Sequence, residues 1–349
     1  MLTIVGDCDQ RLFGMKPADR LSRQTSNLGE LHLVAHASAV LSDDTVAWLV
    51  NHPGTVVASS GGRPLAAAVS PADIEAARSV IDGGKGLSVT KADAIGPVYV
   101  RKLRRTLTPL ALALGEQPRP VVERKLFASV YKGVTDIVTK YAWPEPALWL
   151  TRAAAALGLS PNIVTIVGLI LTFVAGWQFY VGNLASGMTA AWLMTLLDTV
   201  DGKLARVTLT SSEFGNRLDH GNDMIHPPLW WLCLAHGISL AEPANMWVWP
   251  ACWTILATYV IGRFLEKGFK SKFGFNPFMW AQFDSRFRMI VSRRNIILLI
   301  MTVGLILNRP VEALVACAAW SLVSVAIQAV RYSQAAIRSR REPIRAWLG

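Results

Sequence analysis

The sequence predicts a mixed fold, in which a small cytoplasmic α/β domain precedes a bundle of six transmembrane helices. Short apolar runs alternate with helix-like stretches over residues 1–118, which is typical of a layered α/β unit. Long uncharged segments follow between residues 161 and 335, and several approach the about 20 apolar residues that a membrane-spanning helix needs. Hydrophobic residues make up 52% of the chain and charged residues 17%, a composition that favours a membrane protein.

Residues 1–118 carry the signals of a soluble domain. The expected strands are four short apolar runs, at residues 2–5, 31–34, 55–58 and 65–69. The expected helices cover residues 43–50 and 71–81, and the second has Ser70 as its N-cap and Pro71 at its first position. The first residues lack the basic and apolar regions of a secretory signal, so we expect a cytoplasmic N-terminus.

Residues 119–160 are expected to form amphipathic helices. Between Arg124 and Tyr141, apolar residues follow helical spacing, and lysines occupy the opposite face. Such a helix could lie in the membrane interface, since spans begin soon afterwards. Alternatively, its apolar face could pack on the soluble domain.

The six expected spans are residues 162–181, 184–197, 224–240, 246–262, 295–307 and 311–330. Between residues 182 and 349, every lysine and arginine except Arg309 falls in a segment that an even helix count places on one side. The positive-inside rule then predicts that both termini are cytoplasmic, with residues 336–349 as a basic cytoplasmic tail. We expect an integral protein of a bacterial inner membrane.

The formal net charge of +11 could also indicate nucleic-acid binding. The basic residues lie beside apolar spans, however, so membrane lipids are the expected partners and nucleic acid is not. The four cysteines form no CxxC pair and indicate neither a metal site nor a disulfide framework.

Four aspartates mark the candidate active site around the second and third spans. The pattern is D-x2-D-G-x2-A-R-x8-G-x3-D-x3-D, from Asp198 to Asp223. Residues three or four apart share a helix face, so Asp198 and Asp201 point together from one helix, and Asp219 and Asp223 from the next. Unpaired carboxylates at a membrane boundary are costly, and hard cations such as Mg²⁺ or Mn²⁺ relieve that cost.

The other residues of the pattern suit a diphosphate. Gly202, Ala205 and Gly215 allow close approach of a ligand or a neighbouring backbone, and Arg206 supplies a cation for phosphate oxygens. A simpler interpretation is that the acids cap helices and pair with nearby basic residues. A lone D-x2-D would favour that interpretation, whereas the complete pattern within one short window favours a metal-bridged diphosphate.

At every defining position this motif resembles the signature of the CDP-alcohol phosphotransferase family, and the resemblance covers about residues 120–340. It implies six transmembrane helices, a homodimer, and transfer of a phosphatidyl or polyol-phosphate group from a CDP-activated donor to a hydroxyl with release of CMP. It also implies two divalent metal ions held by the four acids, with Asp223 as the catalytic base.

The resemblance assigns donor binding to further residues. Gly202, Ala205, Arg206 and Gly215 would hold the CDP moiety, assisted by Ser212. Asn162 and Thr165 resemble the entrance of the donor site, over a shorter match. The donor could be CDP-diacylglycerol or a CDP-polyol such as CDP-inositol, and the acceptor an alcohol or a polyol phosphate.

The N-terminal domain resembles the sugar-nucleotide-type cytidylyltransferase that some family members carry in front of the membrane domain. Arg11-Leu12 and Lys16-Pro17 match its opening loop, but Asp7-Cys8-Asp9-Gln10 stands where such an enzyme has a Gly-rich phosphate loop. We therefore expect a degenerate, inactive nucleotidyltransferase-like domain. An unrelated small α/β domain is the alternative.

The basic loop from Glu266 to Arg294 either binds an anionic acceptor or a lipid headgroup, or only enforces topology. Arg286 and Arg288, which flank Phe287 beside Asp284, are the acceptor candidates. Two other functions compete with the family interpretation. An intramembrane prenyltransferase would need a second Asp-rich motif, which the sequence lacks, and a non-catalytic membrane scaffold would not need all four aspartates.

Overall fold

The computed structural model describes residues 1–25 and 28–348, without the side chain of Asp219. The chain forms two compact units. The first contains residues 1–133, 148–160 and 203–211, and the second contains residues 134–147, 161–202 and 212–349. The helix Leu184–Val207 (α7) contributes residues to both units.

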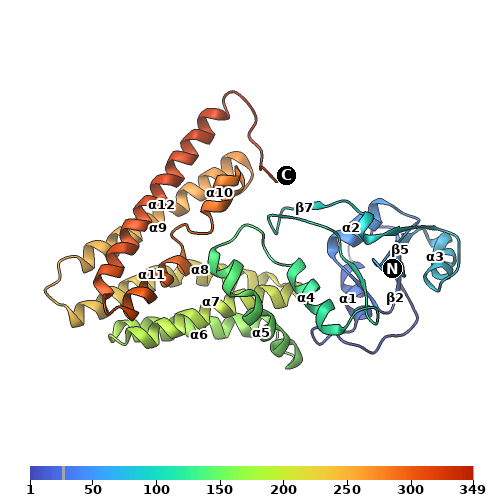
Figure 1. The fold of residues 1–349 in the computed structure, drawn as a ribbon, viewed down its shortest axis with the longest axis horizontal. Coiled ribbons are helices and arrows are strands. Elements are labelled where there is room, and N and C mark those ends of the chain that lie inside the picture. The colour runs from blue at the N-terminus through green and yellow to red at the C-terminus, as the bar shows by residue number, and fades with distance from the viewer. Residues whose placement is uncertain (26–27, 349) are drawn as a thin grey trace. The chain divides into compact units, whose positions relative to one another are not determined.

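The first unit is built on a five-stranded sheet. Its strands, in sheet order, are β1 (Leu2–Val5), β2 (His32–His36), β5 (Pro64–Val69), β4 (Thr55–Ala58) and β6 (Ser88–Lys91). β1 runs parallel to β2 and β4 parallel to β6, while β5 is antiparallel to both of its neighbours. Figure 1 labels β2 and β5 of this sheet and the helices α1, α2 and α3 of the same unit. The sequence analysis predicted β1 and β4 at these bounds and placed β2 and β5 to within two residues at each end.

Helices cover both faces of this sheet. Ala66 and Ala68 of β5 pack on one face with residues of α1 (Pro17–Gln24) and α2 (Asp43–Asn51). Ala67 of β5 packs on the other face with residues of α3 (Ile74–Ile81). This alternation follows from the two-residue period of a strand, and it gives the layered α/β unit that the sequence predicts.

The expected helix over residues 71–81 begins differently from the prediction. Pro71–Asp73 form a 3-10 turn, and α3 starts only at Ile74. Ser70 takes the extended N-cap conformation, but its hydroxyl donates to the Asp73 carboxylate at 2.7 Å. Two small antiparallel ladders, which the sequence did not reveal, complete the unit: β3 (Ala39–Leu41) with β9 (Ala111–Ala113), and β7 (Val98–Val100) with β8 (Arg105–Leu107).

The prediction of one amphipathic helix from Arg124 to Tyr141 is wrong. α4 (Arg119–Ser129) ends before Val130, and Val138–Ala142 form a separate π-helical turn (η4) before α5 (Pro144–Ala156). The cause is tertiary, because the Gly133 amide donates to the Leu103 carbonyl at 2.8 Å. A Cβ at Gly133 would lie 2.7 Å from the Arg104 carbonyl oxygen, so the chain approaches this loop too closely to continue as a regular helix.

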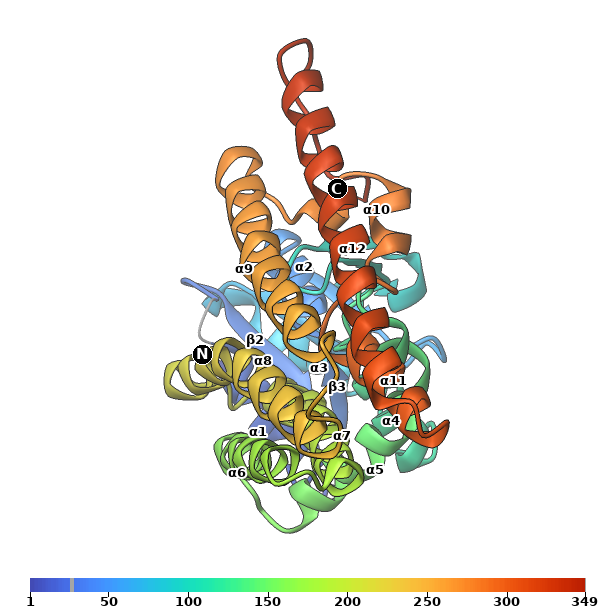
Figure 2. The same cartoon turned by 90° about the vertical axis from the view of Figure 1, so that its left-hand side faces the viewer.

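Helices make up the second unit, and a helix occurs at each of the six predicted spans. They are α6 (Pro161–Tyr180), α7 (Leu184–Val207), α8 (Glu213–Ala241), α9 (Val248–Phe273), α11 (Arg294–Ile306) and α12 (Pro310–Arg338). Between α9 and α11 lie the 3-10 turn η5 (Pro277–Met279) and the short helix α10 (Gln282–Phe287). α9 packs along α12, and α6 along α8 (Figure 2).

Three of these helices, α6, α9 and α12, are long and apolar enough to cross a membrane by length and composition. α11 is apolar but shorter. α7 and α8 extend past their predicted spans into the polar aspartate motif. The described residues therefore support a membrane protein with at least these three candidate spans.

Candidate active site

Asp198 and Asp223 converge on one cation. Asp198 lies on α7 and Asp223 on α8, and each accepts a hydrogen bond from the guanidinium of Arg294 at the start of α11. The Arg294 Nη1 atom is 3.3 Å from the Asp223 carboxylate, and Nη2 pairs with Asp198. The exposed fraction is 18% for the Arg294 side chain and 20% for Asp198. The exposed fraction of the Asp223 side chain is 41%, so the two helices bring one mostly buried and one partly exposed motif carboxylate to the same cation.

Asp201 lies one turn along α7 and is buried. The Thr165 hydroxyl of α6 donates to its Oδ2 atom at 2.6 Å, and the Gly202 amide donates to its Oδ1 atom. Hydrogen bonds to an ionised carboxylate are short and strong, so these donors fix the acid in place. Thr165 and Gly202, both predicted as donor-site residues, therefore contact the aspartate motif directly.

Asp219 lies on α8, one turn before Asp223. Its side chain is outside the described part of the chain. Among the described side chains, no group of three or more histidines, cysteines and acids forms a candidate metal centre. The described cluster instead consists of two acids, Asp198 and Asp223, that share one guanidinium, and the buried Asp201 follows Asp198 by three residues on α7.

A proline in α8 explains why the backbone carbonyl of Asp223 accepts hydrogen bonds from another helix. Pro227 and Pro228 lie inside α8, and Pro227 has no amide to donate to the carbonyl of Asp223, four residues earlier. That carbonyl accepts instead from the Tyr259 hydroxyl at 3.3 Å and from the Arg263 guanidinium at 3.4 Å, both on α9. The interruption in α8 thus links the Asp223 backbone to a third helix.

The start of α8 is tied to the start of α6. Ser212 is the N-cap of α8, and its hydroxyl oxygen accepts from the Gly215 amide at 3.0 Å. The same hydroxyl donates to Asn162 Oδ1 at 3.2 Å. A Cβ at Gly215 would lie 2.5 Å from that oxygen, so a larger residue at this position would require the Asn162 side chain to move. The structure therefore brings three predicted donor-site residues together: Asn162, Ser212 and Gly215.

The rest of the motif lies in the part of α7 that belongs to the first unit. Arg206 donates to the Val130 carbonyl at 3.1 Å, and so does Lys203, whose ammonium also lies 3.3 Å from the centroid of the Tyr131 ring. Two cations thus satisfy the carbonyl that follows α4. The Ala205 carbonyl accepts from the Thr210 amide at 2.9 Å, just beyond the end of α7.

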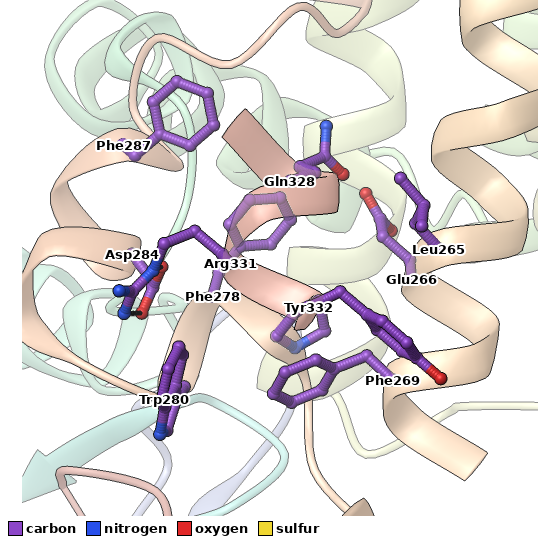
Figure 3. A pocket seen from close by; sticks show the side chains of 11 residues that line it. Leu265, Glu266, Phe269, Phe278, Trp280, Asp284, Phe287, Gln328, Arg331 and Tyr332 are labelled. Atoms are coloured by element: carbon purple, nitrogen blue, oxygen red, sulfur yellow. Dashed lines mark hydrogen bonds and ion pairs between the residues drawn. The ribbon is translucent and has the colours of Figure 1, made fainter. Parts of the chain in front are cut away.

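The two acceptor candidates lie at α10. Arg286 is exposed, and the Arg288 guanidinium lies 5.6 Å from the centroid of the Phe278 ring. Asp284, next to them in the sequence, instead accepts two hydrogen bonds from Arg331, both of 2.7 Å. Figure 3 shows Arg331 extending towards Asp284 beside Trp280 in a pocket of aromatic, charged and other side chains. The pocket is lined by Leu265, Glu266, Phe269, Pro277, Phe278, Trp280, Asp284, Phe287, Gln328, Arg331 and Tyr332.

Sequence reasoning missed the role of Arg294 and the network behind it. Asn295, the next residue, donates to the buried carboxylate of Asp136 at 2.9 Å, and Thr139 donates to the same carboxylate through its amide and its hydroxyl. Burial alone would raise the pKa of Asp136, but the Asn295 and Thr139 hydrogen bonds and the charge of Arg288 lower it below its usual value. A basic residue directly before an apolar helix was the available signal, and the sequence analysis left it open between ligand binding and topology.

Comparison with known proteins gives a family match for this region. The sequence model described as CDP-alcohol phosphatidyltransferase matches residues 158–327. The matched range holds α6 to α9, α11 and most of α12, and so the complete aspartate motif.

Curated relatives match over shorter stretches. The archaetidylinositol phosphate synthase of Pyrococcus horikoshii is 37% identical over 82 residues, which are 23% of this chain and 43% of that protein. The phosphatidylinositol phosphate synthase of Mycobacterium tuberculosis is 34% identical over 91 residues, 24% of this chain and 42% of that protein. The chain thus spans less than half the length of these relatives.

A solved structure also resembles the chain. The crystal structure of Mycobacterium tuberculosis phosphatidylinositol phosphate synthase with CDP-DAG bound has a TM-score of 0.42 and 20% sequence identity. The match covers 52% of this chain and 90% of that one.

Proposed function

Because residues 158–327 match the family model described as CDP-alcohol phosphatidyltransferase, we propose that the chain transfers a phosphate-linked group from a CDP-activated donor to an acceptor hydroxyl, with release of CMP. The convergence of Asp198 and Asp223 from two helices onto one cationic group is the observation that carries the proposal. Phosphoryl transfer develops negative charge, and a preorganised cluster of charged groups supports its stabilisation.

The donor set suits hard divalent cations. The described acids offer carboxylate oxygens alone, which Mg²⁺ and Mn²⁺ prefer, and Asp198 and Asp223 already hold one cationic group between them. We propose that Asp198, Asp201, Asp219 and Asp223 hold two such ions. When bound, the ions would neutralise the donor diphosphate and the charge that develops on the departing phosphate.

Asp223 is the proposed catalytic base. The exposed fraction of its side chain is 41%, about twice that of Asp198, so an acceptor hydroxyl could reach it. Asp223 takes the proton of that hydroxyl as its oxygen forms a bond to the β-phosphorus of the donor. The bond from this phosphorus to the CMP oxygen breaks, and CMP leaves with the electron pair. A carboxylate is a weak base for an alcohol, so the proton moves late in the step.

Other residues of the motif would position the donor. The contacts among Asn162, Ser212 and Gly215 fix the first turn of α8 against α6. Thr165 and Gly202 orient the Asp201 carboxylate. We assign these residues, together with Ala205 and Arg206, to binding of the CDP moiety.

The donor is proposed to be a CDP-activated lipid such as CDP-diacylglycerol, and the acceptor a phosphorylated polyol such as inositol phosphate. This choice rests on the two curated relatives, whose names describe synthesis of inositol phosphate lipids. Arg286 and Arg288 stay the candidates for binding the anionic acceptor. The basic residues beside the spans support a bacterial inner-membrane protein with both termini cytoplasmic, and family resemblance supports a homodimer.

Product analysis with purified full-length protein and Mg²⁺ tests the proposal. One reaction contains labelled CDP-diacylglycerol and inositol phosphate, and the other contains CDP-inositol and a lipid alcohol. We expect CMP and an inositol phosphate lipid from the first reaction, identified by mass. Product from the second reaction alone would reverse the assignment of donor and acceptor. Failure of both to release CMP, together with turnover of a prenyl diphosphate, would favour the prenyltransferase alternative.

A further inference from the structure

Arg294 lies where the two acids of the cluster meet. Its guanidinium contacts Asp198 through Nη2 and Asp223 through Nη1, and Nη1 lies 3.9 Å from the Met194 sulfur. The flat guanidinium has several donors in a fixed fork, which suits two carboxylates at once. Arg294 is therefore the resident counter-ion of Asp198 and Asp223.

The position of Arg294 is set by its surroundings. It is the first residue of α11, where the helix dipole disfavours a positive charge. The adjacent Asn295 is anchored by hydrogen bonds to Asp136 at 2.9 Å and to Thr139 at 3.1 Å. This anchor fixes the backbone from which the Arg294 side chain extends, and the two carboxylates offset the unfavourable dipole.

We propose that Arg294 competes with divalent cations for the oxygens of Asp198 and Asp223, and that it thereby lowers the affinity of the cluster for metal. This inference rests on the metal-dependent function proposed above. A carboxylate oxygen engaged by the guanidinium is less available as a metal ligand. The positive charge of Arg294 also repels a second cation within a few ångströms, where solvent screens the interaction weakly.

The opposite role is physically reasonable and makes the test decisive. If Arg294 only clamped the two carboxylates together, its removal would let them repel and separate. The affinity for metal would then fall. Competition predicts a rise, so the sign of the change separates the two roles.

Mn²⁺ binding to the full-length protein in detergent, followed by electron paramagnetic resonance, measures this affinity without any turnover. Arg294→Gln is expected to bind Mn²⁺ more tightly by on the order of tenfold, because one neighbouring charge and its hydrogen bonds are lost. Arg294→Lys keeps the charge but not the fork, so we expect a smaller gain. The matched control is Arg293→Gln, since Arg293 pairs with Glu266 rather than with the cluster.

A second measurement uses thermal unfolding. Without divalent cations Arg294→Gln should melt below the wild type, because two acids lose their counter-ion, and Mg²⁺ should restore more stability to it than to the wild type. If Arg294→Gln does not fold, Arg294→Lys carries the test, and it must still bind Mn²⁺ more tightly than the wild type.

Three results would overturn the inference. Unchanged or weaker Mn²⁺ binding in the Arg294 variants would show that the guanidinium does not compete. An equal rise in Mn²⁺ affinity in Arg293→Gln would show that the loss of any nearby positive charge has this effect, and not the loss of the Arg294 contacts. If Asp198→Asn leaves Mn²⁺ binding unchanged, both in the wild type and in the Arg294 variants, the aspartate cluster is not the metal site. Both this inference and the proposed function would then be wrong.

Discussion

Thr165 holds Asp201 through a single hydroxyl. Its Oγ1 atom is 2.6 Å from the Asp201 carboxylate and 3.1 Å from the Pro161 carbonyl, so one proton serves two acceptors and the closer acceptor carries the charge. Asp201 is buried, so water cannot easily replace a lost donor. A buried carboxylate that loses a hydrogen bond is destabilised by about 1–3 kcal/mol.

Thr165→Val should therefore lower the melting temperature of the purified protein and reduce CMP release, because valine keeps the shape of threonine and removes the hydroxyl. Thr165→Ser is the control, and it should behave close to the wild type because it keeps the donor. Thermal unfolding and a CMP assay on the same preparations provide the two measurements. If the valine and serine variants behave alike, the hydroxyl does not support Asp201.

At the scale of single residues, the sequence singled out Asp198 and Asp223, which the structure brings to one cation, but it did not single out that cation, Arg294. The spacing of Asp198 and Asp223 specifies helix faces, because the helical period is local. The partner Arg294 lies about seventy residues beyond Asp223, and no local pattern connects the two. Its place in the cluster depends on how α11 packs beside α7 and α8, which composition and periodicity do not encode.

Packing between α6 and α8 depends on glycines at their contacts. A Cβ added at Gly237 of α8 would lie 1.9 Å from the Phe179 carbonyl oxygen of α6, an impossible distance without movement of a backbone. A Cβ added at Gly168 of α6 would meet no heavy atom within 4 Å. An added methyl group would therefore clash at Gly237 but not at Gly168, although both glycines lie on this pair of helices.

Gly237→Ala should destabilise the protein by about 1–3 kcal/mol, because overpacking forces the two helices apart. Gly168→Ala should be neutral or slightly stabilising, since alanine favours the helix by about 1 kcal/mol over glycine. Thermal unfolding of both variants in the same detergent tests this pair. Equal melting temperatures would contradict the close approach of α8 to α6.

At the scale of elements, hydrophobic runs predicted where helices occur better than where they end. The second span was expected to stop at residue 197. The helix α7 continues beyond it, through the aspartate motif, to Val207. The helix expected across Gly133 is broken by a contact with residues 103–104, distant in sequence. Local propensity cannot contain such contacts, and the same limit explains the short strands that the sequence did not reveal.

The whole chain combines two units of different character, and the first is expected to lack nucleotide chemistry. Lys16, which the resemblance to cytidylyltransferases would direct to phosphate, is paired with Asp9 at 2.7 Å. Asp7 and Asp9 both lie in the segment Asp7-Cys8-Asp9-Gln10, which stands where a cytidylyltransferase has a Gly-rich loop. Carboxylates at this position repel the phosphates of CTP, whereas cytidylyl transfer needs backbone amides directed at them.

We therefore predict that the full-length protein does not release pyrophosphate from CTP in the presence of a polyol phosphate and Mg²⁺. Pyrophosphate detection by a coupled assay measures this directly. An authentic cytidylyltransferase, added to the same mixture, verifies that the reagents are competent. Pyrophosphate formation by the chain alone would make it bifunctional, producing its own CDP-activated donor.

The central claim is that the aspartate cluster performs CDP-dependent group transfer. It is tested most directly by CMP release from CDP-diacylglycerol, with inositol phosphate and Mg²⁺, by the wild type, Asp223→Asn and Glu213→Gln. Glu213 is the matched control, because it lies on α8 at an exposed site and pairs with Arg217. We expect CMP from the wild type and Glu213→Gln, and none above background from a folded Asp223→Asn. Wild-type rates of CMP release from Asp223→Asn would contradict the account.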